Sequence, residues 1–388
     1  MMRKKKILVV IPSFSIGGTV IALHSWLSLL DTTKFEVDIF PLYRGGVYLD
    51  KMPNCRILPE NVFLSSKLVE GTWCQKIVVQ FFRVLQKFAR WSNLHFITKW
   101  IQSWGGARIG SDAYDAVICY AESIADRVCY YPAKKRITWI HCDYSRYLKL
   151  INGRDERAVY SRFDKIVCVS QYTRNVFAEC MPTCARRAVA IHNVINTELI
   201  CQKASEKVDL DARFRTNCFV IVSVGRLDPV KQFDKIPRIA SEIKRQTNKP
   251  FVWYIIGGAR GFEEYECNIV ENIKNLDLTD CVVLLGEKIN VYPYMAQADL
   301  YVSTSESEAF SLVIQEAKAL SVPVVVNTFG CSQEFVQNGV EGCVVPLSDM
   351  AGCIVELMQE EKRLPIQEYL KKHQYNNDKI YKQIEEML

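Results

Sequence analysis

The stretch DLYVSTSESEAFSLVIQEAKALSVPVVV, residues 299–326, decides the fold because it contains a strand, a loop, a helix and a second strand in succession. DLYVSTS is an apolar run of strand length, and PVVV is another. SLVIQEAKAL predicts a helix that begins near Ser311 and buries three residues at the i, i+4, i+7 spacing, namely Val313, Ala317 and Leu320. A helix that joins two apolar strands indicates a parallel sheet.

Apolar runs rich in Val and Ile recur in both halves of the chain, separated by helix-length amphipathic segments. Near-continuous apolar strands joined through helices indicate parallel sheets that are covered on both faces. We therefore predict an α/β fold with two Rossmann-like domains facing each other across a cleft. The other expected strands are KILVVIPS, FEVDIFPL, DAVICYA, RITWIHC, KIVCVS and AVAIHNV in the first domain, and FVIVSVG, VWYIIGG and CVVLLG in the second.

The 388 residues are enough for two domains of ordinary size. The polar stretch 201–217 separates the two sets of strands, so we place the domain boundary there. The predicted domains are residues 1–200 and 201–370. Residues 371–388 are expected to form a C-terminal helix that packs back on the first domain.

The composition is that of a globular protein, with 49% hydrophobic and 24% charged residues. The apolar run after the basic start MMRKKK is too short for a signal peptide and reads as a buried first strand. Fifteen cysteines are scattered without a CxxC pair, which predicts reduced core thiols in a cytoplasmic protein. The first 200 residues hold 28 Lys/Arg against 16 Asp/Glu, so their basic surface either promotes solubility or binds an anionic partner.

Two loops in the first half follow expected strands. Gly17 and Gly18 lie in IPSFSIGGTV, where they allow a ligand to approach the backbone in front of helix amides, although a Gly-Gly turn can also be plain geometry. The sequence is not GxGxxG, which argues against an NAD-linked dehydrogenase. His141 and Asp143 lie in TWIHCDY, where His141 either hydrogen-bonds a substrate or handles its proton near neutral pH, or is structural.

The segment VSVGRLDPVKQF, residues 222–233, carries two cations at the end of a strand. Gly225 ends the strand, and Arg226 and Lys231 follow on either side of a turn that contains Pro229. Two cations that converge on one point suit a diphosphate, because a guanidinium binds two phosphate oxygens and an ammonium adds a mobile charge. A cationic site for a diphosphate is therefore predicted here.

Glu308 and Glu316 are separated by eight residues, which on one helix would leave them about 12 Å apart and roughly 80° out of line. They could not act on one atom. Because Glu308 is expected in the loop and Glu316 in the first turns of the helix, both can contact one extended ligand at different points. Backbone amides near Ser311 and Leu312 can bind phosphate, and Glu316 can accept two ribose hydroxyls.

At this point the chain resembles the retaining GT-B glycosyltransferases of family 4, the glycosyl transferases group 1. The resemblance spans nearly the whole chain and is strongest over residues 222–345. It rests on the shared order of SIGGTV, WIHCDY, VCVSQYTRNVF, IHNVI, VSVGRLDPVKQF, WYIIGG, VVLLGE, the E-x7-E of Glu308 and Glu316, and PVVVNTFGCSQEFVQNGVEGCVV.

The resemblance implies roles for the residues described above. Arg226 and Lys231 would bind the donor pyrophosphate, and Glu316 the nucleotide ribose. Glu308 and, from the other domain, His141 would contact the donor sugar. The remaining donor-binding positions would be Gly17, Gly18, Gly225, Ser311 and Leu312.

Three motifs depart from the family pattern. Ala309 stands where the family usually has Gly, and Gly330 is followed by Cys331 where the family has a second Gly. Thr19 and Val20 follow the glycines of the first loop, so its GG-x-E pattern is incomplete. The added methyl of Ala309 leaves the identity of the donor sugar open.

The resemblance also implies a reaction that needs no metal and no cofactor. The cations at residues 226 and 231 would neutralise the leaving diphosphate, and the D-x-D of residues 209–211 lies in the proposed linker. Retention of anomeric configuration is implied, through front-face attack by the acceptor hydroxyl. We expect a UDP-sugar first and a GDP-sugar next as the donor, and a glycan or lipid-linked saccharide of bacterial surface polysaccharide synthesis as the acceptor.

Residues 67–108 hold seven Lys/Arg and one acidic residue among eight large aromatic ones. A helical projection places Phe81, Val84, Leu85 and Phe88 on one face and Arg83, Lys87 and Arg90 on another. This pattern fits an amphipathic helix at an anionic membrane, which would place the protein at the inner face of the cell membrane, or an ordinary helix packed on the first domain. Nucleic acid is not an expected partner, because no recognition module accompanies the pattern.

Two other functions fit the same architecture. A nucleotide-sugar 2-epimerase would consume the donor without an acceptor. A catalytically inactive nucleotide-sugar-binding protein would bind the nucleotide and release none. Acceptor-dependent release of nucleoside diphosphate separates these two from a transferase.

Overall fold

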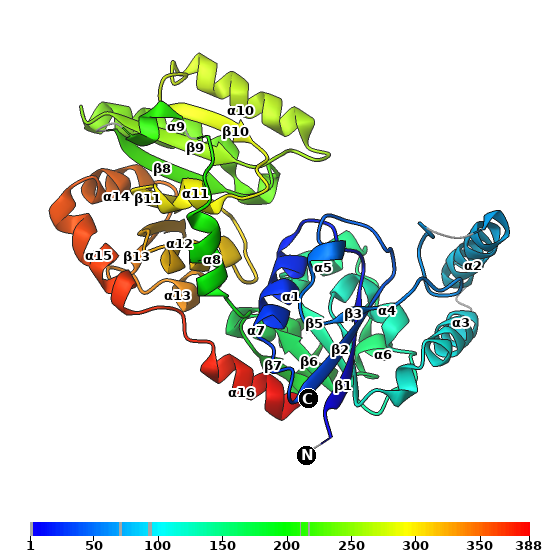
Figure 1. Ribbon diagram of the computed structural model, residues 1–388. Helices are drawn as coiled ribbons and strands as arrows, with labels where there is room; N and C mark the ends of the chain where they lie inside the picture. Colours follow the sequence, from blue (N-terminus) through cyan, green and yellow to red (C-terminus); the bar gives the residue numbers. More distant parts are fainter. Residues whose placement is uncertain (1–2, 70–71, 92–94, 210, 216–217) are drawn as a thin grey trace. The chain divides into compact units, whose positions relative to one another are not determined.

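The computed structural model describes residues 3–69, 72–91, 95–209, 211–215 and 218–388 (Figure 1). The chain divides into two compact units. Unit 1 contains Met1–Val194 together with Asn377–Leu388, and unit 2 contains Ile195–Asn376. The stretch 201–217, which we expected to separate the domains, belongs to unit 2.

Unit 1 is built on a seven-stranded parallel sheet in the order β3-β2-β1-β4-β5-β6-β7. Strand β1 pairs with β2 on one side and with β4 on the other, so the strand order reverses between β1 and β4. The strands are β1 (Lys5–Ile11), β2 (Phe35–Pro41), β3 (Arg56–Ile57), β4 (Ala116–Cys119), β5 (Arg136–Ile140), β6 (Lys165–Cys168) and β7 (Ala188–Ala190).

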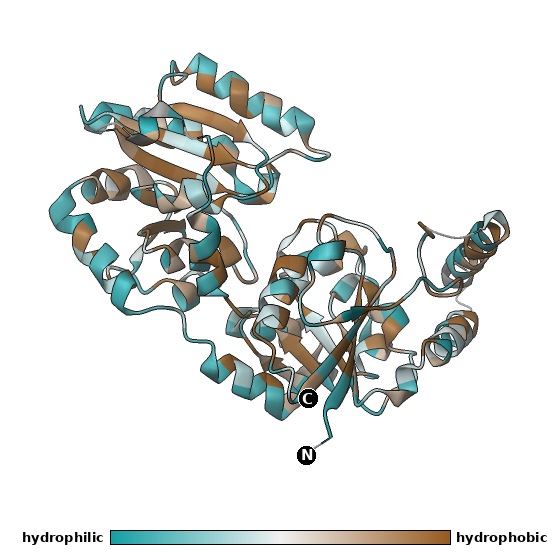
Figure 2. Cartoon of the chain, in the orientation of Figure 1, coloured by the Kyte–Doolittle hydropathy of each residue, from teal (hydrophilic) through white to brown (hydrophobic). Residues whose placement is uncertain are grey.

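The apolar runs of unit 1 form strands because both faces of its sheet are covered. In β1, Leu8 and Val10 belong to one core cluster, and Ile7 and Val9, which point to the opposite face, are equally buried. The strands are accordingly largely brown in the hydropathy view (Figure 2). Cys119 and Cys168 are buried in β4 and β6, as expected for core thiols.

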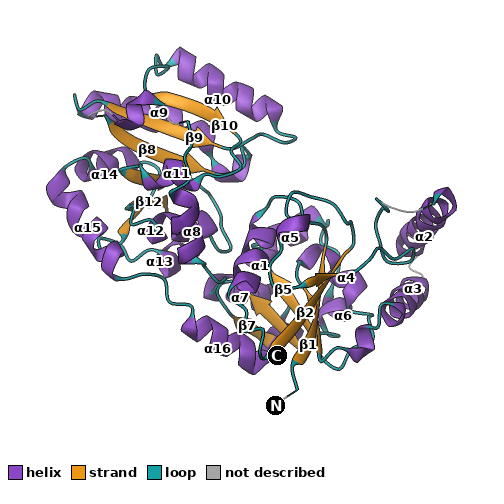
Figure 3. Ribbon diagram, in the orientation of Figure 1, coloured by secondary structure: helices purple, strands orange, loops and turns teal. Residues whose placement is uncertain are grey.

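Helices cover the sheet of unit 1 (Figure 3). The last helix of the chain, α16, is joined to this unit by an ion pair between Lys34 and Glu385, with 2.9 Å between Nζ and Oε1. The helices are α1 (Gly18–Ser28), α2 (Trp73–Trp91), α3 (His95–Arg108), α4 (Ala125–Val128), α5 (Tyr144–Leu150), α6 (Arg157–Tyr160), α7 (Gln171–Cys180) and α16 (Asp378–Met387).

Unit 2 has a six-stranded parallel sheet in the order β10-β9-β8-β11-β12-β13. Strand order reverses between β8 and β11, where Val222 lies beside Tyr301. The strands are β8 (Phe219–Val224), β9 (Phe251–Ile256), β10 (Val282–Gly286), β11 (Leu300–Ser303), β12 (Val324–Asn327) and β13 (Gly342–Val345).

The core of unit 2 lies between its sheet and the helices around it. On one face, Phe219 and Ile221 of β8 pack with Ile239 of α9 and Ile354 of α14. The helices are α8 (Thr197–Ala204), α9 (Ile236–Gln246), α10 (Glu263–Asn275), α11 (Tyr292–Ala296), α12 (Leu312–Ala319), α13 (Ser332–Phe335), α14 (Met350–Leu357) and α15 (Glu360–Lys372). Within the described residues, each helix is too short or too polar to cross a bilayer.

The predicted sheets are confirmed, and two details are corrected. Strands β3 and β13 were not expected, since the first has two residues and the second follows a polar loop. Helix α12 begins directly after Ser311, but Val313 and Leu320 are only partly buried. The buried residues of the helix lie on more than one face and include Ile314, Ala317 and the polar Glu316.

Candidate functional site

The carboxyl ends of β8 and β11 meet at the point where strand order reverses in unit 2. Loops at such a point diverge and leave room for a ligand. The loop after β8 carries Arg226 and Lys231, and the loop after β11 carries Glu308. Glu306 N donates to Val230 O over 2.8 Å, which holds the two loops side by side.

Asp228 organises the loop after β8. Its Oδ2 accepts from Arg226 Nε over 2.7 Å, while its Oδ1 accepts from the backbone amides of Val230 and Lys231 over 3.0 and 3.2 Å. Asp228 is 3% exposed, whereas the Arg226 side chain is 61% exposed. The buried carboxylate therefore fixes both predicted cations to one turn and leaves the guanidinium open to a ligand.

Lys231 is paired with Glu308. Nζ lies 2.6 Å from Oε1, and the two side chains are 22% and 13% exposed. Thr304 Oγ1 donates to the Lys231 carbonyl over 2.7 Å, so the backbone of this lysine is held by the neighbouring loop. A cation and an acid that were predicted from separate motifs are thus in direct contact.

Hydrogen bonds from neutral groups hold the loop after β11. Ser305 Oγ donates to Glu308 Oε1 over 2.8 Å, and Asn327 Nδ2, at the end of β12, donates to Ser305 O over 3.0 Å. Cys331 Sγ donates to Glu308 O over 2.9 Å and is 1% exposed. The carboxylate and the carbonyl of Glu308 are therefore both fixed without a ligand.

Ser311 is the N-cap residue of α12, and Leu312 is its first helical residue. The first backbone N–H groups of a helix have no intrahelical acceptor and carry partial positive charge. Because Leu312 follows Glu308 by four residues, these amides belong to the loop that carries the Lys231–Glu308 pair. They can bind an anion at the same edge of the sheet.

Glu316 lies on the second turn of α12 and is buried. Its Oε1 accepts from Tyr292 Oη over 3.0 Å, and the residue is 5% exposed. Burial raises the pKa of its carboxyl to about 7, although the hydrogen bond from Tyr292 lowers it. A buried carboxyl with one hydroxyl partner has acceptor capacity left for ligand hydroxyls.

In unit 1, Gly17 and Gly18 mark the start of α1 after β1, beside the reversal of strand order. Gly17 is the N-cap residue, and a Cβ added there would have no heavy atom within 4 Å. The space next to Gly17 is therefore open. Gly225 of unit 2 differs, because an added Cβ would lie 3.3 Å from the Phe233 ring and 3.4 Å from Lys231 Cε.

His141 directly follows β5 of unit 1. Its backbone N donates to Glu122 Oε2 over 3.1 Å, and its ring lies 4.7 Å from that of Tyr120. Nε2 is buried and has no hydrogen-bond partner among the described residues. Burial lowers the pKa of the imidazole to about 3, which favours the neutral ring and therefore the hydrogen-bonding alternative over proton transfer. Both roles of His141 stay predictions.

Asp143 has a structural role. It is the N-cap residue of α5, and its Oδ1 accepts from Ser145 N over 3.0 Å. Tyr172 Oη donates to its other oxygen over 2.9 Å. The acid in TWIHCDY therefore fixes the helix that follows His141.

Three groups of the unit 2 site were missed in the sequence, namely Asp228, Ser305 and Tyr292, and Cys331 was named only as a departure from the family pattern. The Asp-Pro pair at residues 228–229 is a turn signal that could have identified Asp228. Tyr292 is distant from Glu316 in the sequence, and no local pattern indicates their contact. Within the part of the chain that the structure describes, no group of three or more His, Cys, Asp or Glu could hold a metal ion.

Comparison with known families and curated proteins identifies relatives of part of the chain. Residues 206–376 match the model of the family described as glycosyl transferases group 1. A 146-residue segment is 27% identical to the N-acetyl-alpha-D-glucosaminyl L-malate synthase of Bacillus anthracis, over 37% of each chain. A 167-residue segment is 31% identical to the N-acetylgalactosamine-N,N'-diacetylbacillosaminyl-diphospho-undecaprenol 4-alpha-N-acetylgalactosaminyltransferase of Campylobacter jejuni, over 43% of this chain and 42% of that protein. The chain thus spans less than half the length of these two relatives.

Solved structures resemble the whole chain. HepE from Anabaena, in complex with UDP and glucose, gives a TM-score of 0.73 at 19% identity and 99% coverage of both chains. Sucrose-phosphate synthase from Thermosynechococcus elongatus gives 0.70 at 17% identity, with 99% of this chain and 98% of that chain covered. At these identities the likeness establishes the fold, which is the predicted α/β GT-B class. The cleft between the two domains stays a prediction.

Proposed function

Because residues 206–376 match the model of the family described as glycosyl transferases group 1, we propose that the chain transfers a sugar from a nucleoside diphosphate to an acceptor hydroxyl. The observation that carries this proposal is the Lys231–Glu308 pair beside Arg226, at the reversal point of the unit 2 sheet. It combines a cationic site for phosphate with an acid that can bind sugar hydroxyls.

The cations act on the leaving group. As the bond between the anomeric carbon and the phosphate oxygen breaks, negative charge grows on the diphosphate. Arg226, fixed by Asp228, and Lys231, fixed by Glu308, are held in place before the reaction. Preorganised charges of this kind stabilise the transition state without reorganisation, so the transfer is proposed to need no metal.

Glu316 binds the nucleoside. Its ionised carboxylate accepts from two ribose hydroxyls, and Tyr292 orients it. Because a pKa of about 7 leaves only part of the population ionised at neutral pH, ribose binding also favours the charged form.

Retention of anomeric configuration is proposed, with the acceptor attacking from the side that the diphosphate leaves. The departing phosphate oxygen accepts the acceptor proton in this scheme, so no side chain needs to act as a base. His141 then contributes a hydrogen bond to the donor sugar as a neutral ring. Gly17 and Gly18 leave room for the substrate at the start of α1.

The donor is proposed to be a UDP-sugar, with a GDP-sugar as the second candidate. The HepE complex with UDP and glucose supports this choice. The acceptor is proposed to be a glycan or a lipid-linked saccharide of bacterial surface polysaccharide synthesis. The diphospho-undecaprenol in the name of the Campylobacter jejuni relative supports an acceptor on a lipid carrier.

A lipid-linked acceptor would place the reaction at a membrane. We therefore propose that the protein acts at the inner face of the cell membrane, through contact between residues 67–108 and anionic lipid. The charge of this segment, seven Lys/Arg against one acidic residue, supports the contact.

The proposal is tested by supplying UDP-sugars and GDP-sugars with lipid-linked and soluble saccharide acceptors, and measuring nucleoside diphosphate release together with the product. A transferase releases the diphosphate with an acceptor present and forms a glycoside. Donor consumption without acceptor, with a 2-epimer as product, would instead establish the epimerase. Binding of nucleotide without turnover of any donor would establish an inactive binding protein.

A further inference from the structure

We propose that the outer face of the α2–α3 pair docks on an anionic phospholipid bilayer, and that a pocket at the start of α2 receives the phosphate of one lipid headgroup. This inference rests on the proposed membrane contact and assigns it to particular side chains. We call the exposed apolar side chains of α2 and α3 the docking face.

The docking face begins with a stripe along α2. Its residues follow one another at intervals of four, four, three and four, which places them on one side of the helix. Their exposed fractions would be unusual for large apolar residues packed on a domain. The stripe consists of Trp73 (77%), Ile77 (46%), Phe81 (61%), Val84 (66%) and Phe88 (50%).

Helix α3 extends the docking face. Phe96, Trp100 and Trp104 are 67%, 58% and 38% exposed and recur every four residues. The rings of Trp100 and Trp104 stack with their centroids 5.9 Å apart. Aromatic side chains of this kind are favoured at the boundary between lipid headgroups and acyl chains.

The opposite faces of α2 and α3 hold the pair on unit 1. Val79 of α2 is 2% exposed, and the buried Gln86 of α2 accepts from Gln102 Nε2 of α3 over 3.2 Å. A Cβ at Gly105 would lie 2.5 Å from the Leu64 side chain, so α3 packs closely there. Leu85, expected with Phe81 on the apolar face, is partly buried. The sequence left two alternatives for this segment. Packing on the first domain describes the inner faces of α2 and α3, and contact with a membrane is proposed for the docking face.

The positive charge of α2 and α3 favours anionic lipid over a protein as the partner of the docking face. Lys76, Arg83 and Lys87 are exposed and lie along one edge of the α2 stripe, and Lys99 is exposed on α3. Arg90 and Trp91 lie outside the residues whose side chains are described. Basic residues beside an exposed apolar stripe match a bilayer, whose anionic headgroups lie directly above its acyl chains.

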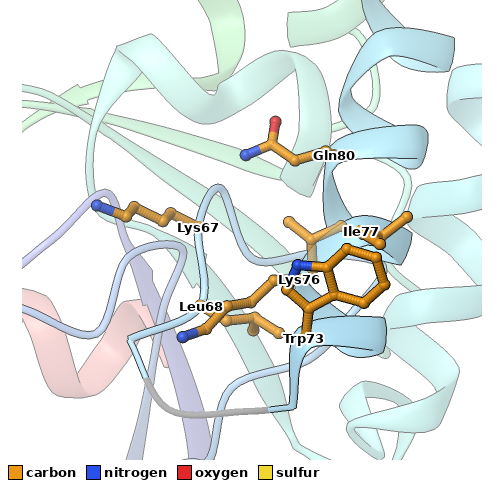
Figure 4. A pocket seen from close by; sticks show the side chains of 7 residues that line it. Lys67, Leu68, Trp73, Lys76, Ile77 and Gln80 are labelled. Atoms are coloured by element: carbon orange, nitrogen blue, oxygen red, sulfur yellow. The ribbon is translucent and has the colours of Figure 1, made fainter.

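The pocket adds a site for one headgroup. It measures about 310 Å³ and lies between the segment after the bridge of Lys67 to Tyr43 and the first turns of α2. Figure 4 shows the amino ends of Lys67 and Lys76 on one side and Trp73 and Ile77 on the other. In the proposed complex a lipid phosphate pairs with these ammonium groups, and the glycerol and the start of an acyl chain lie against the apolar side.

The test uses the full chain and sedimentation with vesicles of phosphatidylcholine, with or without phosphatidylglycerol, at physiological salt. The wild-type chain should bind the anionic vesicles and bind neutral ones weakly. Phe81→Ser with Val84→Ser should abolish most binding to both. Lys67→Gln with Lys76→Gln should lower binding to anionic vesicles about tenfold and leave neutral binding unchanged.

Matched controls separate these effects from general changes of surface. Leu150→Ser removes an apolar residue that is 82% exposed, and Lys371→Gln with Lys372→Gln removes two exposed charges; all should bind like the wild type. The inference is overturned if the wild type binds no vesicles, or if the controls fall as far as the docking-face variants. It is also overturned if Phe81→Ser with Val84→Ser dissociates a dimer of this chain in solution. Transfer to a soluble acceptor, measured on the same variants, tests the proposed function separately.

Discussion

Lys231 Nζ lies 2.6 Å from Glu308 Oε1, and this ion pair joins the loops that follow β8 and β11. The two strands are neighbours at the point where the strand order of unit 2 reverses. The pair therefore crosses the position where α/β sheets bind their ligands. In the proposed reaction, this ion pair fixes both the cation that would bind the diphosphate and the acid that would bind the donor sugar before the donor arrives.

The first prediction concerns this pair. Lys231→Ala and Glu308→Ala should each reduce turnover by about 10² to 10³. The fold-reduction in the double variant should be far smaller than the product of the two single fold-reductions, because the two groups act as a unit. Lys231→Ala should also lower the free energy of unfolding by ~1–2 kcal/mol, since it leaves a mostly buried carboxylate without its ion-pair partner. Steady-state kinetics and thermal unfolding measure both effects. If the fold-reduction in the double variant equalled the product of the two single fold-reductions, the residues would act independently.

The second prediction concerns Arg226. Arg226→Ala should reduce turnover by about 10² to 10³ through weaker stabilisation of the leaving diphosphate. Arg238→Ala is the matched control, because that side chain is 84% exposed on α9 and pairs with Glu242. The control should retain wild-type rates. Equal rates for Arg226→Ala and the wild type would remove Arg226 from the site.

The third prediction concerns the ionisation of Glu316. Its pKa is about 7 in the folded chain against an ordinary value of 4.5, so between these pH values the folded chain holds a proton that the unfolded chain releases. The free energy of unfolding should therefore fall as the pH rises through this window. Glu316→Gln removes the buried charge, so it should be more stable than the wild type by ~1–3 kcal/mol at about pH 8 and comparable at about pH 4.

Thermal unfolding across this pH range measures the effect, and nucleotide titration provides the second readout. Glu316→Gln should bind nucleoside diphosphate more weakly while unfolding at a higher temperature. Parallel stability curves for the wild type and the variant would contradict the shifted pKa.

The fourth prediction concerns Cys331, which stands where the family pattern has Gly and donates to Glu308 O. Cys331→Ala removes this hydrogen bond, so the donor KM should rise and kcat/KM should fall about tenfold through misplacement of the loop. Cys331→Ser keeps a donor and should recover most of the loss. Cys267→Ala, at an exposed thiol on α10, is the control. Equal kinetics for the Ala and Ser variants would show that the thiol only fills space.

Much of the fold was predictable because parallel strands buried on both faces leave a plain signal. Runs such as FVIVSVG and PVVVNT are apolar throughout, and each became a strand of unit 2. Strand β3 was missed because two residues give no periodicity. The extent of burial on α12 was also missed, because the i, i+4, i+7 spacing predicts only one buried face of a helix and α12 is buried on several.

The charged residues of the candidate site were found because they follow strands directly. Their partners were harder to find, since contacts such as Tyr292–Glu316 and Cys331–Glu308 join residues that are distant in sequence. The lowered pKa of His141 results from its burial, which a position after a strand does not reveal. The sequence thus proposed the ligand-binding groups, and the structure shows the contacts that orient these side chains.

The most direct measurement compares the affinities of a nucleoside and its diphosphate by calorimetric titration, using whichever of UDP and GDP binds more tightly. In the wild-type chain the diphosphate should bind about a hundredfold more tightly than the nucleoside, because Arg226 and Lys231 contact the phosphates. In the Arg226→Ala, Lys231→Ala variant this difference should nearly vanish while nucleoside affinity persists. An unchanged difference in the variant, or no binding of either diphosphate to the wild type, would contradict the account.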